Sequence, residues 1–268
     1  MPELPEVETI RRELEPAMVG RQFGEAWAFP HPKFLPALEA AGAAVVSVDR
    51  RGKYLVLGLD DGHELIVHLG MTGSLAIQPR GSAAEDPYMR AWWVLDDGDD
   101  VLSFRDVRRF GRLAVVPVGE YVGTLAVQGP DGLDPTISAD DFWKATKASR
   151  RPIKTQLLSQ RPIAGVGNIY ADEALWLAKV NPLRRSITRA QAAALLEAIR
   201  EVLAAALGNG GTTLRDYRTL AGEEGTNQTR LKAYGRYGLP CLRCGTILRR
   251  TILDGRATTW CPTCQPRR

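Results

Sequence analysis

The chain begins Met1-Pro2-Glu3, and these residue types allow amine chemistry at the N-terminus. Removal of the initiator methionine would leave Pro2 with a free secondary amine. An α-amino group titrates near pH ~8, far below lysine at ~10.4, so more of it is uncharged at neutral pH. Such an amine attacks carbonyl-like carbons and forms Schiff bases, and Glu3 beside it can move the protons. A frayed N-terminal tail is the simpler interpretation of the same residues.

The cysteines of the chain form two CxxC pairs with sixteen residues between them: Cys241 with Cys244, and Cys261 with Cys264. Two such pairs at this spacing suit a tetrahedral zinc site with four thiolate ligands. Two disulfides are the alternative, which a reducing cytosol disfavours. A module this short cannot bury enough apolar surface to fold alone, so we expect one structural zinc ion to supply its folding free energy.

Two segments combine glycine with arginine or apolar side chains. Phe104–Arg112 holds four arginines and Phe110 where a strand runs into a loop, and His68–Gly73 ends a strand in a glycine-flanked turn that carries Met71. Arginine pairs with phosphates or base edges, and an apolar wedge can fill a gap in stacked bases. A solvated hairpin and a core methionine are the alternatives.

Two further segments are ambiguous when taken alone. Pro162–Tyr170 is glycine-rich and lies between two expected helices, with Asn168 as a candidate N-cap. A helix N-terminus binds phosphate readily, but a simple helix-turn-helix corner explains the spacing equally well. Lys53 follows Arg51-Gly52 just before a strand, where a solvated surface lysine is the simpler interpretation.

The charge of the chain is unevenly distributed. The net charge is +4, yet residues 225–268 hold nine basic residues and one acidic residue, so this segment carries +8 and the remainder −4. A basic block on a mildly acidic body indicates a polyanion partner. No apolar run approaches the ~18 residues of a membrane span and no signal peptide is evident, so we expect a cytoplasmic protein without a membrane partner.

These residues must be positioned by two kinds of structure. An opening helix is expected from Pro5, with Val7, Ile10 and Leu14 on one face. Short strands follow, with hairpin turns at Asp61-Gly62 and Asp97-Gly98, which predicts a β-sandwich or barrel. The expected strands are 44–48, 54–59, 65–69, 91–95, 101–104 and 113–116.

The pattern changes near Ser138 to helical periodicity. Helices are expected at 139–148, 153–160, 169–179 and 189–207, and the last contributes core residues at Leu195, Leu196, Ile199, Val202 and Leu203. A glycine-rich segment ends that helix. Residues 222–228 are expected to form a mobile loop, and the zinc module closes the chain.

Together, the motifs of the chain resemble those of the formamidopyrimidine-DNA glycosylases, bacterial bifunctional enzymes that excise oxidised purines. The matching motifs fall in one order over nearly the whole length: MPELPEVET at 1, RGKYL at 51, HLGMTGSL at 68, RRFG at 108, AGVGNIYADEAL at 164, GGTTLRDY at 210, YGR at 234 and GRATTWCPTCQ at 255.

The resemblance implies an α+β fold in which two domains flank a DNA-binding cleft. An N-terminal catalytic β-sandwich with an opening helix would span residues 1–130. A helix–two-turn–helix domain with a lesion loop would span 131–228, and a four-cysteine zinc finger 229–268. The partner implied is damaged double-stranded DNA, bound by a monomer.

The resemblance also implies site roles. Pro2 would be the nucleophile at the sugar C1′, with Glu3 as proton donor and acceptor, and Lys53 and Arg256 would assist the proton transfers. Further contacts with the DNA and the lesion would come from Glu6, Met71, Arg108, Arg109, Phe110, Arg151, Lys154 and Asn168. Among these, Lys53, Asn168 and Arg256 would hold the phosphates around the flipped nucleotide. Met71, Arg108 and Phe110 would fill the void left by the base, with Arg108 reading the orphaned cytosine. Flipping is needed because a base inside a duplex is unreachable.

Three departures from the family pattern accompany the match. Pro87–Arg90 stands where many relatives carry a histidine pair, Thr226-Asn227-Gln228 lacks the usual aromatic before Gln228, and Val107 replaces a common proline. An endonuclease VIII-like glycosylase for oxidised pyrimidines is the alternative enzyme, which Leu4 and the Met71, Arg108 and Phe110 set disfavour. A non-catalytic zinc-bearing DNA-binding protein is the alternative class, and the Pro2-Glu3 start argues against it.

Overall fold

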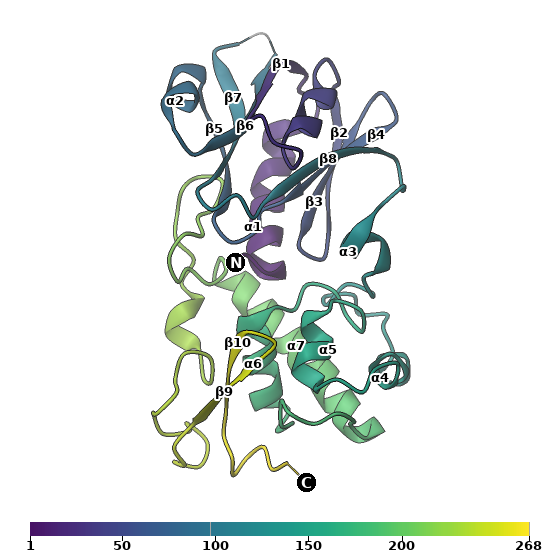
Figure 1. Ribbon diagram of the computed structural model, residues 1–268, viewed down its shortest axis with the longest axis vertical. Coiled ribbons are helices and arrows are strands. Elements are labelled where there is room, and N and C mark those ends of the chain that lie inside the picture. The colour runs from purple at the N-terminus through teal and green to yellow at the C-terminus, as the bar shows by residue number, and fades with distance from the viewer. Residues whose placement is uncertain (97, 268) are drawn as a thin grey trace. The chain divides into compact units, whose positions relative to one another are not determined.

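The computed structural model describes residues 1–96 and 98–267, and the chain divides into two compact units (Figure 1). The first unit comprises Met1–Ala126 with Asn209–Thr226, and the second comprises Val127–Gly208 with Asn227–Arg268. The mixed α+β class expected from the sequence is confirmed. The expected domains at 1–130, 131–228 and 229–268 stay a prediction. They are defined by function, whereas the two units are defined by compactness.

The first unit is built from two antiparallel four-stranded sheets and the helix α1 (Leu4–Met18). One sheet has the order β1-β6-β7-β5 and the other the order β2-β3-β4-β8. Their bounds are β1 (Phe23–Ala28), β2 (Val45–Arg51), β3 (Tyr54–Leu59), β4 (His63–His68), β5 (Gly73–Pro79), β6 (Met89–Leu95), β7 (Asp100–Asp106) and β8 (Arg112–Pro117). Short helical segments connect them: η1 (Leu35–Ala40), α2 (Arg80–Glu85) and α3 (Gly123–Val127).

One hydrophobic core joins both sheets to α1. Val7, Ile10 and Leu14 are buried as their helical spacing predicts, and they share this core with side chains such as Trp93 and Leu57 from the two sheets. Burial of this apolar surface is the main stabilising term for the sandwich. The strands expected at β2, β3, β4, β6, β7 and β8 are confirmed within a few residues.

Two strands were not expected. β1 contains Gly24 and two alanines and buries only its end residues, while β5 starts with Gly73 and ends with Pro79. Glycine, alanine and proline are poor strand formers, so pairing with β6 and β7 decides these segments. The Asp61-Gly62 turn joins β3 to β4 as expected, whereas Asp97 of the other expected turn lies outside the described residues.

Residues 209–226 pack with the first unit rather than with the helices that precede them. Tyr217 is buried in the sandwich core, and its hydroxyl donates to the carbonyl oxygen of Gly210 at 3.1 Å. Within the segment expected to be mobile, the backbone N–H of Gly225 donates to Thr213 Oγ1 at 3.0 Å. The mobility itself stays a prediction.

The second unit is helical and ends in a β-hairpin. Its elements are α4 (Ala139–Lys147), α5 (Ile153–Leu158), α6 (Asn168–Leu177), α7 (Arg189–Gly208), η2 (Asn227–Arg230), β9 (Arg249–Leu253) and β10 (Arg256–Trp260). The four helices expected from periodicity are confirmed. α4 begins at the N-cap Ser138, whose hydroxyl oxygen accepts the Asp141 N–H. In α7 the expected core residues are buried except Val202, which is half-buried.

The helix pair α5 and α6 is joined by the turns at residues 159–167. Gln160 holds them, because its amide nitrogen donates to the Val166 carbonyl at 2.7 Å and its amide oxygen accepts the Gly165 N–H at 2.8 Å. Gly165 adopts φ +94°, a conformation that favours glycine. The expectation that Asn168 caps α6 is wrong: Gly167 is the N-cap, and Asn168 is the first helical residue.

Candidate functional site

The start of α1 forms a buried polar cluster. Glu3 and Glu6 are 2% and 1% exposed, and they make a capping box in which the Glu3 N–H donates to Glu6 Oε2 at 2.8 Å. The other oxygen of Glu6 accepts the Thr212 N–H at 2.7 Å. Glu6 therefore fixes both the Pro2-Glu3 start and the 209–226 segment. Pro2 is buried at this start, so its position is defined by the fold.

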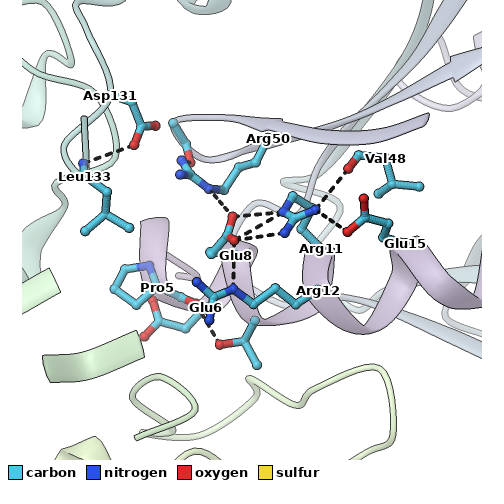
Figure 2. Close-up of polar contacts among 12 residues, drawn as sticks. Pro5, Glu6, Glu8, Arg11, Arg12, Glu15, Val48, Arg50, Asp131 and Leu133 are labelled. Carbon is cyan, nitrogen blue, oxygen red and sulfur yellow. Dashed lines mark hydrogen bonds and ion pairs between the residues drawn. The ribbon is translucent and has the colours of Figure 1, made fainter. Parts of the chain in front are cut away.

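A second cluster joins α1 to β2 through Glu8 and Arg50 (Figure 2). Glu8 is 8% exposed and bonds three guanidinium groups, from Arg11, Arg12 and Arg50 of β2. The Arg50 guanidinium also donates to the Gly52 carbonyl oxygen at 3.1 Å, directly before the buried Lys53. One ion pair thus connects the helix that starts at Pro2-Glu3 with the Lys53 turn.

The Glu8 carboxylate is held in its charged form by these arginines. Burial raises the pKa of Glu8, but hydrogen bonds from Arg11, Arg50 and Arg12 and the charge of Arg50 outweigh it. The result is a pKa below the ordinary value of 4.5. Nothing in the sequence pattern singled out Glu8 and Arg50, because their separation of 42 residues reveals no pairing.

The side chains of Met71, Arg108 and Phe110 are brought together on the first unit. The Arg108 guanidinium lies 4.7 Å from the centre of the Phe110 ring, and its Nη1 lies 3.8 Å from the Met71 sulfur. Phe110 is 48% exposed, so its ring is accessible from solvent. The three side chains thus lie together, and their role in filling the void left by a flipped base stays a prediction.

Arg109 takes a strained backbone conformation between the other two. Its φ is +56°, in the left-handed region that non-glycine residues rarely adopt. The Lys33 amino group donates to its carbonyl oxygen at 2.9 Å and helps to hold this conformation. The exposed Arg109 side chain is consequently turned differently from its neighbours, with its guanidinium 5.8 Å from the Phe29 ring.

A cavity of about 360 Å³ lies beside Phe110 in the first unit, lined in part by His68, Tyr54 and Arg112. His68 stands opposite both Tyr54 and Arg112 in the sheet, with the Tyr54 ring 4.7 Å from its own. Burial and the charges of Lys53 and Arg112 lower the pKa of His68 to about 4, so it is neutral at neutral pH. Sequence reasoning named the His68–Gly73 motif but missed His68 itself.

In the second unit, Asn168 opens α6 with its side chain turned inward. Its Oδ1 is buried and has no hydrogen-bond partner among the described residues. A contact between Asn168 and a DNA phosphate stays a prediction.

Three basic residues of the second unit have very different environments. Arg256 is exposed at the start of β10, and Arg151 is exposed and pairs with Asp254 at 3.1 Å. Lys154, by contrast, has no exposed surface and pairs with the buried Asp172 at 2.7 Å. It also donates to the Ala257 carbonyl at 3.0 Å, so in this structure Lys154 supports β10 from beneath. A direct contact between Lys154 and DNA stays a prediction.

The buried Lys154 and Asp172 pair joins three elements. Asp172 also accepts the Thr259 N–H of β10 at 2.9 Å. Burial raises the pKa of Asp172 to about 7, and the charge and hydrogen bond of Lys154 oppose this rise. The pair therefore ties the hairpin that bears Arg256 to α5 and α6, which is a positioning role that the sequence alone did not reveal.

The four cysteines form a zinc site. Their sulfur atoms all lie within 4.8 Å of one another, close to the ~3.8 Å expected between sulfurs of a tetrahedral site with Zn–S near 2.3 Å. Four thiolates this close together repel one another, and a bound cation removes that repulsion. Trp176 of α6 packs on the finger and donates to Cys241 Sγ at 3.4 Å. The residues thus fit one structural zinc.

The structure places residues from each of the three segments that depart from the family pattern, Pro87–Arg90, Val107 and Thr226–Gln228. Arg90 is buried under the 106–111 loop, while Tyr88 is 41% exposed and lies 4.9 Å from the Arg105 guanidinium. Val107 is 40% exposed at the loop. Asn227 is buried and opens η2.

Three family models match the chain in order. The formamidopyrimidine-DNA glycosylase N-terminal domain matches residues 1–113, and the formamidopyrimidine-DNA glycosylase H2TH domain matches residues 128–218. A zinc finger found in FPG and IleRS matches residues 238–267. The models match residues in both compact units, and the third covers the four-cysteine finger.

Similarity to individual proteins also extends over the full length. The formamidopyrimidine-DNA glycosylase of Thermus thermophilus is 45% identical over 271 residues, covering 99% of this chain and 98% of that protein. That of Deinococcus radiodurans is 42% identical over 283 residues, covering 100% and 98%. Among solved structures, MutM (Fpg) from Thermus thermophilus matches with a TM-score of 0.90 at 45% identity, covering 98% of each chain. A Lactococcus lactis Fpg variant in complex with a Fapy-dG containing DNA matches with a TM-score of 0.89 at 33% identity, covering 99% and 100%.

The sandwich, the helix pair, the zinc finger and these matches define the class first: a base-excision-repair DNA glycosylase with AP-lyase activity. Within that class, the chain belongs to the formamidopyrimidine-DNA glycosylase family.

Proposed function

We propose that the protein excises oxidised purines, 8-oxoguanine and formamidopyrimidines, from duplex DNA through a Schiff base at Pro2. The observation that carries the proposal is the buried start of α1, where Pro2 and Glu3 are fixed by Glu6 and connected through Glu8 and Arg50 to Lys53. A nucleophile and its proton carriers need such fixed positions to react efficiently.

The chemistry follows from an uncharged N-terminal amine. After removal of Met1, the Pro2 nitrogen attacks C1′ of the flipped nucleotide, the bond between C1′ and the base breaks, and the base leaves with a proton. Loss of the amine proton and opening of the sugar give an iminium. That cation acidifies the sugar C–H bonds, so β-elimination and then δ-elimination release the phosphates on the two sides. We assign the proton transfers to Glu3, with Lys53 and Arg256 assisting in elimination.

The remaining site residues are assigned to binding. Met71, Arg108 and Phe110, adjacent in the structure, would fill the void left by the flipped base and read the opposite cytosine. Arg109, Arg151 and Asn168 would contact the DNA backbone. Glu6 and Lys154 act beneath the surface, since both are buried and paired. Zinc supplies the fold of the finger that presents Arg256.

Solved relatives in complex with damaged DNA support the proposed partner. Structures similar to this chain include complexes of Lactococcus lactis Fpg with Fapy-dG containing DNA and with abasic site containing DNA, and a complex of MutM with carbocyclic 8-oxo-G containing DNA. No helix within residues 1–96 and 98–267 has both the length and the apolar character needed to cross a membrane. We propose that the protein acts as a monomer in the bacterial cytoplasm, on DNA.

Borohydride trapping tests the covalent step. On duplex DNA with a defined lesion, the wild-type protein should form a reduced covalent adduct. A form with an uncleaved N-terminal extension should form none, and Pro2→Gly, which carries a primary amine, should form the adduct more slowly. Glycine at position two still permits methionine removal. The Gly variant therefore differs from wild type in having a primary instead of a secondary amine at the N-terminus. N-terminal mass measurement confirms the processing of each protein. Full trapping by the extended form would refute Pro2 as the nucleophile.

An excision panel separates the alternatives. The proposal requires faster excision of 8-oxoguanine and formamidopyrimidines than of oxidised pyrimidines opposite their normal partners. The reverse order would identify an endonuclease VIII-like activity. Binding to lesion DNA with no adduct and no excision would identify a non-catalytic DNA-binding protein.

A further inference from the structure

Asp106 is a fully buried acidic residue beside Met71, Arg108 and Phe110, the three side chains proposed to form a wedge. It joins the loops that carry them. It ends β7 with 0% exposure, opposite Gly73 in the sheet. Its carboxylate accepts the Gly111 N–H at 2.7 Å, the Arg108 N–H at 3.3 Å and the hydroxyl of Thr72. One side chain therefore bonds both the turn after Met71 and the two ends of the Arg108–Gly111 loop.

Thr72 completes this connection. Its hydroxyl donates to Asp106 and its Oγ1 accepts the Arg108 N–H at 3.1 Å. The two loops also touch through their backbones, since a Cβ on Gly70 would lie 2.5 Å from the Gly111 nitrogen. Gly70 has φ +65°, so glycine is required here on both counts.

Arg90 holds the backbone of Asp106 in place. It is 4% exposed, and its Nε donates to the Asp106 carbonyl oxygen at 2.8 Å. Its Nη1 donates to the Met89 carbonyl at 2.8 Å, which anchors it on β6. Burial and the charge of Arg109 lower the pKa of Arg90, whereas the nearby charge of Asp106 raises it. The segment that departs from the family pattern thus acts here as a support.

We propose that Asp106, with Thr72 and Arg90, is a positioning residue that holds Met71, Arg108 and Phe110 ready for insertion before DNA binds. This proposal rests on the proposed function, because the wedge role of those three side chains is itself proposed. Insertion into a base stack requires the wedge to be rigid, since ordering a loose loop during binding would cost conformational entropy. The hydrogen bonds of Asp106 and Thr72 remove that cost by fixing both loops in the unbound protein.

Two substrates separate positioning from chemistry. Duplex DNA with 2-aminopurine beside an 8-oxoguanine reports base flipping by stopped-flow fluorescence, and excision opposite each of the four bases reports selectivity. Borohydride trapping on a single-stranded abasic oligonucleotide needs Pro2 but no wedge. The proteins compared are wild type, Thr72→Val, Thr72→Ser, Asp106→Asn and Phe110→Ala.

The matched pair at position 72 gives the sharpest test. Thr72→Val removes only the hydroxyl, and we expect flipping about tenfold slower or more, consistent with loss of hydrogen bonds to a charged group. The ratio of the excision rate opposite cytosine to the rates opposite the other bases should fall by a similar factor. Borohydride trapping on single-stranded DNA should stay at the wild-type rate. Thr72→Ser keeps the hydroxyl and should behave as wild type. Asp106→Asn should match Thr72→Val or exceed it.

The outcomes distinguish this proposal from the one it rests on. Suppose that Phe110→Ala flips the base slowly while Thr72→Val and Asp106→Asn flip it at the wild-type rate. That result would overturn the positioning role of Asp106 and Thr72 but would support the wedge role of Phe110. Normal flipping by Phe110→Ala would refute the wedge, and the positioning proposal with it. An equal loss of single-strand trapping in Thr72→Val would also overturn the proposal, because the effect would then be general. Since Thr72→Val keeps the shape and volume of the side chain, the test stands even where Asp106→Asn folds poorly.

Discussion

Replacing Glu8 should destabilise the protein more than replacing Arg50, its partner in a buried ion pair. The Glu8 and Arg50 side chains are only 10% and 9% exposed, so their interaction is screened little by water. Glu8→Gln leaves the buried Arg50 guanidinium without its carboxylate. Breaking a buried pair costs ~3–5 kcal/mol, and we expect about 3 kcal/mol because the cluster lies near the surface. Arg50→Met should cost less, since Glu8 keeps Arg11 and Arg12.

Arg12→Met is the matched control for this prediction. Arg12 also bonds Glu8, at 2.9 Å, but its side chain is 59% exposed. Exposed ion pairs are worth ~0–1 kcal/mol, so this variant should lose little stability. Thermal unfolding and hydrogen exchange in α1 and the β2–β3 turn measure the differences. Exchange localises them, which matters because a chain with two compact units need not unfold in one step.

The pH dependence of stability provides a second measurement on the same variant. The folded pKa of Glu8 lies below its ordinary value of 4.5, so its charge stabilises the fold fully above pH 4.5. That contribution is lost as the pH falls through the folded pKa. The stability difference between wild type and Glu8→Gln should therefore be constant near neutrality and shrink in acid.

Catalysis should respond as well, because the pair connects the start of α1 to the Lys53 turn. A displacement of about 1 Å between reacting groups can lower a rate ~100-fold. Borohydride trapping by Glu8→Gln should slow by at least tenfold under conditions where the variant is folded, while Arg12→Met keeps the wild-type rate. Equal stability, equal acid dependence and equal trapping for these two variants would refute the reasoning.

Four further predictions concern the DNA contacts and the second unit. Arg108→Ala should lose its preference for cytosine opposite the lesion, by up to the ~1–3 kcal/mol of a bidentate base contact, and unchanged excision ratios opposite the four bases would contradict this. Zinc removal or Cys244→Ala should abolish DNA binding while unfolding of the first unit is unchanged, with zinc restoring the metal-stripped protein; normal cleavage by zinc-free protein would show that the finger is dispensable. Arg256→Ala with zinc retained should reduce the slope of log affinity against log salt by ~0.9, the value for one phosphate, and an unchanged slope would place that contact elsewhere. Lys154→Met should destabilise the second unit, because it removes the charge and the hydrogen bond that hold the buried Asp172 carboxylate and so raises the Asp172 pKa further. The double variant Lys154→Met/Asp172→Leu should recover much of the loss, whereas a single-variant cost below ~1 kcal/mol in denaturant unfolding would show that the pair does not support the hairpin.

Local patterns in the sequence predict much of the fold and the identity of several site residues. Helical periodicity predicts α1 and α7 correctly because their apolar side chains recur on one face, and alternation with turn signals predicts six strands. The cysteine spacing predicts the zinc site because tetrahedral thiolate geometry needs paired ligands on short turns. Pro2, Glu3 and Lys53 are named from residue type and motif, and their roles stay predictions.

Other features depend on pairs of residues far apart in the chain. β1 and β5 form because neighbouring strands accept their hydrogen bonds, against the weak propensities of glycine, alanine and proline. Residues 209–226 follow a helix of the second unit yet pack with the first, because Glu6 and the sandwich core bind Thr212 and Tyr217. Sequence-local reasoning contains no information about such partners.

The supports of the site were decided only by tertiary structure. Glu8 and Arg50, Thr72 and Asp106, and Lys154 and Asp172 are separated by 42, 34 and 18 residues, and each pair meets only after the chain has folded. In the sequence, a charged residue looks the same whether it is solvated or buried in a pair. Burial makes the difference, because a charge removed from water must find a partner, and that partner then fixes the position of the groups around it.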